Sequence, residues 1–338
     1  MNPHTVEPMC VVNITNRLVY KRKYGSIHSN MSLSTKLFNY VLDQDIEGVR
    51  RELESNDSIA YANKGGARRL YCYCETPLEV AVQMNSYEIA ELLILAGADV
   101  NVAYGPALWT PLHVATYSGK CDMMSMLIEC GANIEAQDIQ GATPLFKAYG
   151  NGLEMLLEEG ANVHAVNHMG ITPLMMAACA CKVDVVKMLL SYEADVDTKD
   201  NRGFESLAYA VRAADVKIVE MLLAHNADVD AKDNQGLTPL IHLACMYGTP
   251  IQHQRPHRRQ LVIAEMLLKN GADIFAKAFD GRTALGASHG DLKKLLQLEM
   301  DNLKFTAFAM SSNDRLGEGS QAAKLHEEML RMVWVNVK

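Results

Sequence analysis

Few side chains in this 338-residue sequence have the types and spacing that catalysis or metal binding requires. His253 and His257 are four residues apart, which on a helix would put two imidazoles on one face as metal ligands. Pro256 lies between them and argues against a helix, so we expect no metal site there. Residues 317–322 (Gly-Glu-Gly-Ser-Gln-Ala) resemble a dinucleotide-binding loop but lack a preceding strand. We therefore expect no catalytic residue, no cofactor and no metal.

The cysteines also offer no chemistry by their spacing. There are eight of them, and none is paired as zinc-binding cysteines are. Cys72 and Cys74, like Cys179 and Cys181, are too close in sequence for an unstrained disulfide. Buried thiols in a reducing compartment explain this usage, and we expect a cytoplasmic protein. A nuclear location stays open because of local basic runs, and a mitochondrial presequence stays open because residues 1–30 contain a single acid, Glu7.

Charge and hydropathy restrict the class of partner. Lys and Arg number 32 and Asp and Glu 40, so the formal net charge is −8. This acidic balance argues against general nucleic-acid binding and is compatible with a basic partner protein. No apolar run approaches the length that crosses a bilayer, so we expect no membrane insertion.

The elements that must position any functional residue come from an internal repeat. Six segments open with Thr-Pro-Leu or Thr-Ala-Leu, and a seventh opens in the altered form Glu205-Ser206-Leu207. The steps between these openings are 34, 33, 29, 33, 33 and 45 residues. A period near 33 predicts a stacked repeat array instead of one closed core.

Each repeat predicts two short helices. Thr is a good N-cap and Pro suits the first helical position, so each opening starts a helix. A second apolar stripe follows, such as Met124, Leu127 and Ile128, and then a Gly-Ala-Asp or Gly-Ala-Asn stop. In the fourth repeat Glu193 replaces that Gly, so we expect some strain at the end of its second helix.

These units resemble ankyrin repeats, with the full Thr-Pro-Leu-His opening at Thr110-Pro111-Leu112-His113. The resemblance implies an all-α solenoid of stacked helix-turn-helix units with β-turn or hairpin tips. It also implies that the imidazole of His113 ties neighbouring turns together. We divide the chain into an irregular segment 1–32, the array 33–298 and a tail 299–338 with a terminal helix. The expected units lie near 33–60, 76–101, 110–136, 143–165, 172–198, 205–231, 238–277 and 283–298.

Two repeats depart from the period. The third is short by one helical turn, and we place the loss at the junction Tyr149–Gly152. The sixth carries a basic insertion, 249–260, which we expect to leave the array as a loop. This loop is either part of a binding face or a tolerated surface loop.

The resemblance implies a protein that binds another protein through its turn tips and its first helices. Family positions that vary with the partner correspond to exposed aromatic, apolar, polar and basic residues, the chemistry of interface anchors. These are Trp109, Tyr117, Ile139, Gln140, His168, Met169, Arg202, Phe204, Arg212, Tyr247 and Arg258, with Phe279 and Arg282 in the last unit.

We expect a non-catalytic adaptor or scaffold, with two alternatives. Residues 325–333 weakly resemble the opening of an F-box helix, which would make the chain a substrate-recognition subunit of a ubiquitin ligase. The same residues would otherwise form a helix that caps the last repeat. The second alternative is a structural subunit of a large assembly.

Overall fold

The computed structural model describes residues 33–55, 76–246 and 256–316. Within these ranges the regular elements are helices, apart from two isolated antiparallel bridges, Tyr104 with Trp109 and Lys277 with Thr283. The bridges lie in turn tips, as expected for hairpin-like tips. The chain divides into two compact units, residues 1–176 with 187–194 and residues 177–186 with 195–338. We describe each unit by itself.

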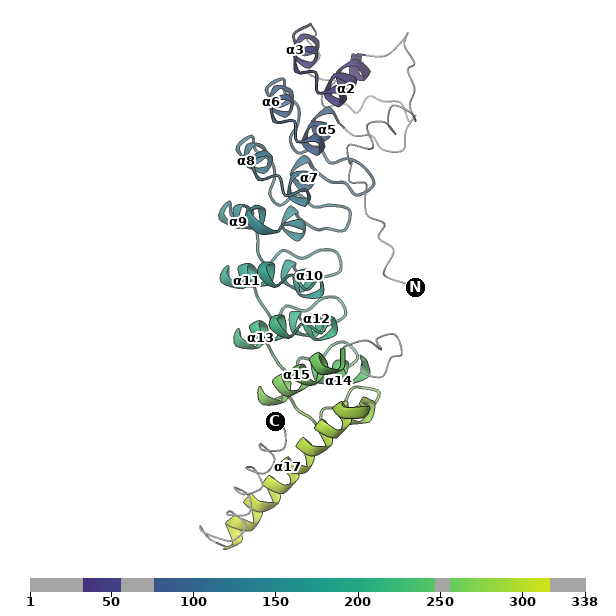
Figure 1. Cartoon of the computed structure of the whole chain (residues 1–338), viewed down its shortest axis with the longest axis vertical. Coiled ribbons are helices and arrows are strands. Elements are labelled where there is room, and N and C mark those ends of the chain that lie inside the picture. Colours follow the sequence, from purple (N-terminus) through teal and green to yellow (C-terminus); the bar gives the residue numbers. More distant parts are fainter. Residues whose placement is uncertain (1–32, 56–75, 247–255, 317–338) are drawn as a thin grey trace. The chain divides into compact units, whose positions relative to one another are not determined.

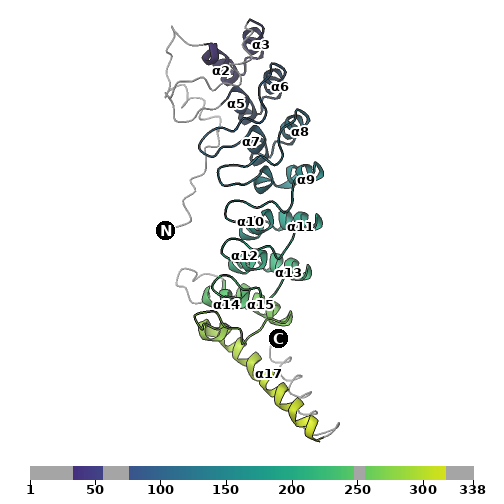
Figure 2. The ribbon, with the colours of Figure 1, turned by 180° about the vertical axis from the view of Figure 1, so that it is seen from behind.

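The first unit is a series of helix pairs in chain order (Figure 1; Figure 2 shows the opposite side). The first helix of each pair packs on the first helix of the next, and the second helices form another row. We call these rows the inner and outer helices. The pairs are α2 (Leu33–Asp43) with α3 (Ile46–Ser55), α5 (Pro77–Met84) with α6 (Tyr87–Leu95), α7 (Pro111–Tyr117) with α8 (Cys121–Glu129), and η1 (Pro144–Lys147) with α9 (Gly150–Glu158).

The second unit repeats this arrangement, with inner helices α12, α14 and α16 and outer helices α13, α15 and α17. Helices α10 (Pro173–Cys179) and α11 (Val183–Ser191) contribute residues to both units. The remaining helices are α12 (Ser206–Ala213), α13 (Val216–Ala224), α14 (Pro239–Met246), α15 (Pro256–Lys269), α16 (Ala284–Ala287) and α17 (Gly290–Leu316).

The predicted caps start and stop these helices. The hydroxyl of Thr76 accepts a hydrogen bond from the Glu79 N–H, and Thr110 forms a capping box with His113. Gly97 and Gly131 have φ of 88° and 86°, which is the left-handed conformation that ends a helix without a steric cost. Glu193 adopts the same conformation at φ 58°, where an L side chain is strained, as expected from its sequence.

The core of each unit lies between the inner and outer helices. Leu112 of α7 and Leu127 of α8 are fully buried, as are Leu207 of α12 and Leu222 of α13. Burial of one such leucine stabilises the fold by roughly 2 kcal/mol relative to exposure. The apolar stripes predicted for both helices of each repeat therefore form the core.

The third repeat lost its turn in a different place from the one predicted. Its inner element is η1, a four-residue 3₁₀ helix, whereas α7 has seven residues. The missing turn therefore belongs to the first helix, and its placement at Tyr149–Gly152 was wrong. In this short element the Thr143 hydroxyl makes no cap, and among the described buried polar atoms its Oγ1 is one without a hydrogen-bond partner.

Two boundaries near the C-terminal end also differ from expectation. Residues 256–260, expected in the basic loop, form the start of α15. Pro256 is the first residue of this helix, a position where the backbone N–H has no partner within the helix, so a proline is tolerated there. Helix α17 runs without a break from Gly290 to Leu316, so the division at 298/299 falls inside one helix. Residues 1–32, 249–255 and the predicted terminal helix near 325–334 lie outside the described residues.

None of the described helices is both long and apolar enough to cross a membrane.

Candidate functional site

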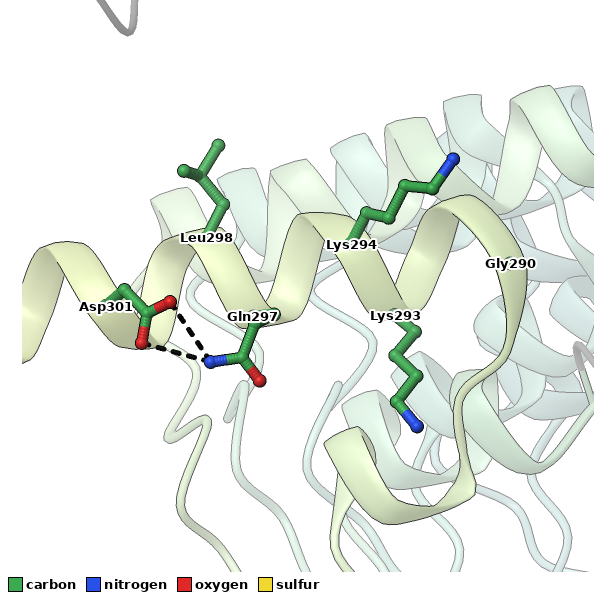
Figure 3. Close-up of a pocket in the computed structure, with 6 residues that line it drawn as sticks. All are labelled: Gly290, Lys293, Lys294, Gln297, Leu298 and Asp301. Atoms are coloured by element: carbon green, nitrogen blue, oxygen red, sulfur yellow. Dashed lines mark hydrogen bonds between the residues drawn. The ribbon is translucent and has the colours of Figure 1, made fainter.

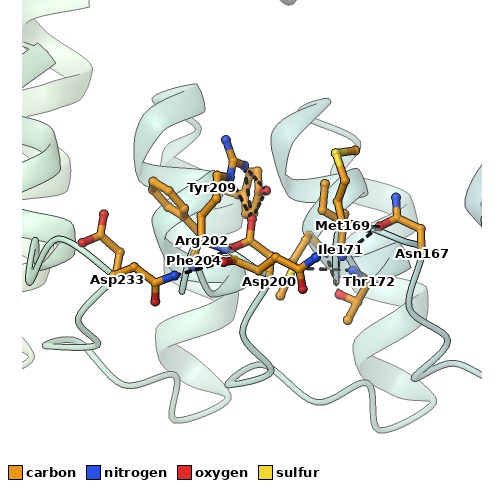
Figure 4. Close-up of polar contacts among 12 residues, drawn as sticks. Asn167, Met169, Ile171, Thr172, Asp200, Arg202, Phe204, Tyr209 and Asp233 are labelled. Atoms are coloured by element: carbon orange, nitrogen blue, oxygen red, sulfur yellow. Dashed lines mark hydrogen bonds and ion pairs between the residues drawn. The ribbon is translucent and has the colours of Figure 1, made fainter. Parts of the chain in front are cut away.

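Buried carboxylate and amide side chains fix the turn tips that carry most of the candidate residues. In the first unit, Asp138 Oδ1 accepts hydrogen bonds from the Gln140 and Ala142 N–H groups at 2.8 and 2.9 Å. Asn167 Oδ1 does the same for Met169 and Ile171, at 2.9 and 3.0 Å (Figure 4). The exposed side chains of these tips therefore stand on rigid turns, which lowers the entropy lost on binding.

Each of these tips is also bonded to the tip before it. The Ile139 N–H donates to the Ala107 carbonyl at 2.8 Å, and the His168 N–H donates to the Gln140 carbonyl at 2.9 Å. The spacing of successive tips is therefore set by the backbone. Ile139, Gln140, His168 and Met169 are all exposed on this series, as predicted from the sequence.

An aromatic pair lies beside these tips. The Trp109 and Tyr117 rings are 5.3 Å apart between centroids, and the Lys147 ammonium lies 5.7 Å from the Trp109 centroid. Tyr117 is exposed and Trp109 is partly buried. The two side chains come from one repeat, Trp109 from its tip and Tyr117 from the end of its inner helix α7.

We call Leu108, Tyr117, Ile139 and Met169 the apolar tip row, since each is roughly half exposed. Sequence reasoning missed Leu108, because it precedes the Thr-Pro-Leu opening and resembles a core leucine. It also missed Lys147, which lies in the shortened inner helix of the third repeat and approaches the Trp109 ring of the repeat before it. Leu108 has a φ of 53°, a conformation that is rare for leucine and that the sequence did not predict.

His113 links two tips, as the family resemblance implied. Its Nδ1 accepts from the Thr110 N–H at 3.2 Å, and its Nε2–H donates to the Ala142 carbonyl at 3.1 Å. Only a neutral imidazole can both accept and donate in this way. Burial accordingly lowers the pKa of His113, although the Ala142 carbonyl and the Asp138 carboxylate oppose this change.

In the second unit, Arg202 is held in one position by two neighbours (Figure 4). Its Nε and Nη2 donate to Asp200 Oδ2 at 3.2 and 3.1 Å, and Nη2 also donates to the Tyr209 hydroxyl at 2.6 Å. The Tyr209 hydroxyl donates to the same Asp200 oxygen at 2.8 Å. Burial first, and then this hydrogen bond, raise the pKa of Tyr209 to about 12. Tyr209 was not among the predicted site residues.

The expected exposure of Phe204 was wrong, because its side chain is only 9% exposed. Its ring packs against Tyr209 and the imidazole of His242, with centroids 5.8 and 4.9 Å away. The guanidinium carbons of Arg202 and Arg212 lie 4.9 and 5.2 Å from the same ring. Phe204 is therefore a platform for two exposed arginines; we call the three residues the arginine cluster.

Two other predicted residues, Tyr247 and Arg258, add nothing to the site. Arg258 is exposed near the start of α15, on the outer row, and Tyr247 lies outside the described residues. Among the described residues no three His, Cys, Asp or Glu side chains converge as metal ligands. A shallow depression on α17 is lined by Gly290, Lys293, Lys294, Gln297, Leu298 and Asp301 (Figure 3). Its lining comes from one helix, so it is an open patch of helix surface.

Comparison with known families agrees with this geometry. A family model described as ankyrin repeats (3 copies) matches residues 70–138, 105–167, 147–233 and 194–278. The overlapping matches cover more than half of the 338 residues. The chain therefore belongs to the ankyrin-repeat proteins, and the predicted fold class is confirmed.

Relatives share only a part of the chain. Regulatory protein NPR5 of Arabidopsis thaliana is 35% identical over 104 residues, which are 30% of this chain and 21% of that protein. Cyclin-dependent kinase 4 inhibitor B of Rattus norvegicus is 33% identical over 100 residues, 30% of this chain and 70% of the inhibitor. The match to the plant relative thus spans about a fifth of its length.

A solved structure shows the same architecture. The ankyrin repeat domain of Bcl-3, described as a unique member of the IkappaB protein family, aligns with a TM-score of 0.56 at 25% sequence identity. The alignment covers 66% of this chain and 98% of that domain. Membership of this family implies that the chain binds protein partners.

Proposed function

We propose that this protein is an adaptor or scaffold that binds a partner protein through its turn tips and inner helices, without catalysis of its own. The observation that carries this proposal is the apolar tip row, four large exposed side chains, of which Ile139 and Met169 lie on turns fixed by Asp138 and Asn167. Leu108 lies on the preceding tip, whose Ala107 carbonyl accepts from the Ile139 N–H, and Tyr117 ends α7. Exposed apolar groups on a rigid scaffold bury area on binding with little loss of entropy.

The relatives support the same class of function. One is named as an inhibitor of a cyclin-dependent kinase, and the structural relative is described as a member of the IkappaB family. The name of the kinase inhibitor describes a protein that acts by binding and not by catalysis.

Photo-crosslinking in cells tests this proposal. Benzoylphenylalanine replaces Tyr117 in one variant, Ile139 in a second and Leu95 in a third. Leu95 is a matched control, because it is 79% exposed but lies at the end of the outer helix α6. We expect discrete adducts with a partner protein from positions 117 and 139 and none from position 95. Adducts that form equally from all three positions, or from position 95 alone, would refute binding through the tips.

The ligase alternative predicts a separate result. If residues 325–333 recruit a ubiquitin ligase, its subunits will co-purify with the full chain and disappear when residues 317–338 are removed. Their absence from both samples would eliminate the alternative and leave the adaptor proposal unchanged.

A further inference from the structure

Arg212 is a cation without an acidic neighbour on the surface of the second unit. It lies in the last turn of α12, its side chain is exposed, and its guanidinium stacks on Phe204. Among the described residues no carboxylate lies within 4 Å of it, although the chain as a whole carries more acids than bases. A guanidinium fixed over an aromatic ring presents its N–H groups in a known plane, which suits a carboxylate.

Arg202 lies on the same ring and is already oriented. The side chain of Asp200 is 1% exposed, so it holds the guanidinium from the protein side, while the side chain of Arg202 remains 61% exposed. The bonds to Asp200 and Tyr209 use Nε and Nη2 and do not involve Nη1. Two guanidiniums therefore share Phe204: Arg202 is held by Asp200 and keeps its Nη1 outside those bonds, and Arg212 supplies the unpaired positive charge.

A later repeat extends this surface. Arg282 donates from Nε to Asp280 at 2.6 Å and from Nη1 to the Cys245 sulfur at 3.7 Å. The Asn234 N–H donates to the Arg202 carbonyl at 2.9 Å, and the Phe279 N–H donates to the Gln235 carbonyl at 3.0 Å. The tip that carries Arg282 is therefore joined to the tip of Arg202 through the one tip between them.

An exposed apolar side chain completes the surface. Phe279 is 78% exposed, and its backbone N–H donates to the Gln235 carbonyl at 3.0 Å, so its tip is fixed. A Cβ on Gly236 would lie 2.9 Å from the Phe279 ring, which shows that the ring rests on that glycine. An exposed aromatic ring on a fixed turn offers a large contact area and loses little entropy when a partner binds.

We propose that Arg212, Arg202, Arg282 and Phe279 form a docking surface for an acidic segment of a partner protein. Carboxylates of the segment pair with the guanidiniums of the arginine cluster, and an apolar side chain packs on Phe279. This inference rests on the proposed function and adds the chemistry of the partner. It reverses locally the preference for a basic partner that the net charge of −8 suggests.

A protein segment fits this surface better than a nucleic acid does. Nucleic-acid binding depends on many phosphate contacts along an extended basic surface. Here the cations are few, Arg282 is paired with Asp280, and the whole chain would repel a long polyanion. A short segment with two or three acids around an apolar residue meets these groups without that repulsion.

Fluorescence anisotropy with the full chain tests the inference. The probe is a short labelled peptide in which glutamates and aspartates flank a central phenylalanine. The same peptide with glutamine and asparagine in place of the acids is the control ligand, and a single-stranded oligonucleotide of equal length is the competing class. The protein variants are Arg212→Gln and Lys217→Gln. Lys217 is a matched control, since it is an exposed cation on the outer helix α13 of the same unit.

We expect the acidic peptide to bind, Arg212→Gln to weaken it about tenfold, and Lys217→Gln to change it less than twofold. Raising the salt concentration should weaken binding, and the amide peptide should not bind. Equal affinity of Arg212→Gln and the wild type, equal binding of the amide peptide, or tighter binding of the oligonucleotide would each overturn the inference. If the acidic peptide fails while adducts still form from positions 117 and 139, the acidic-partner inference falls and the adaptor function stands.

Discussion

The carboxyl group of Glu205 should make the stability of the second unit depend on pH. Glu205 occupies the position before α12 where other repeats have a capping Thr, and it makes no cap. The residue is 4% exposed, Oε1 lies 3.4 Å from the Lys199 ammonium, and Oε2 has no hydrogen-bond partner. A buried carboxylate oxygen without a donor destabilises the ionised form.

Burial accordingly raises the pKa of Glu205 from 4.5 to about 7, against the opposing effect of Lys199. Below pH 4.5 the carboxyl is protonated in the folded and unfolded chains, and its titration costs nothing. Between pH 4.5 and 7 only the unfolded chain loses the proton, so stability falls as the pH rises. Since one pKa unit corresponds to about 1.4 kcal/mol, the full loss is about 3 kcal/mol above pH 7.

The substitution Glu205→Gln removes this titration and keeps the side-chain volume. In urea denaturation followed by circular dichroism, we expect the variant to equal the wild type within about 1 kcal/mol at pH 5. At pH 8 we expect it to be more stable by about 2 to 3 kcal/mol. Hydrogen exchange over residues 205–222 assigns the change to this repeat. Glu220→Gln, on the exposed side of α13, is the control and should show no such difference. An unchanged gap between variant and wild type from pH 5 to pH 8 would refute the reasoning.

Three further predictions concern other repeats. Glu193→Gly should stabilise the chain by about 1 kcal/mol in thermal denaturation, because it removes an L side chain from φ 58°; a lower melting temperature would contradict the inferred strain. Lys120→Met should cost about 1 to 3 kcal/mol, since the ammonium donates to the Val82 and Gln83 carbonyls at the end of α5; Lys182→Met, at the matching position of the fourth repeat, is the control. Residues 140–165 should exchange amide hydrogens faster than 110–132, and uniform protection across both ranges would show that the short repeat is no weak point.

Most of the secondary structure could be predicted because its causes are local. Thr110 caps α7 by accepting a hydrogen bond from the N–H of His113, the third residue of that helix, and Gly131 ends α8 by its positive φ. Both effects depend only on residues that are close in the sequence. The period of the openings then gave the order of the helix pairs. The third repeat was harder, because 17 residues between Thr143 and Gly160 can lose a turn from either helix, and only packing selects which.

The candidate site was predictable in position but not in environment. The tips were correctly located; Ile139 and Met169 are exposed on them, and Tyr117 is exposed at the end of α7. Phe204 occupies an equivalent tip, yet it is buried by Tyr209 of its own repeat and His242 of the next. No sequence pattern shows whether a large side chain at a tip meets solvent or the adjacent repeat.

The sequence alone determined the family, the repeat phase and the ends of most helices, since these follow from residues that contact each other within one repeat. Only the tertiary structure decided which side chains are available to a partner. It placed Arg212 over Phe204 without a carboxylate and left Glu205 Oε2 without a donor. Arg212 and Phe204 belong to one repeat, but His242 of the next repeat packs on the same ring. Burial and charge pairing are properties of distances that the order of residues does not contain.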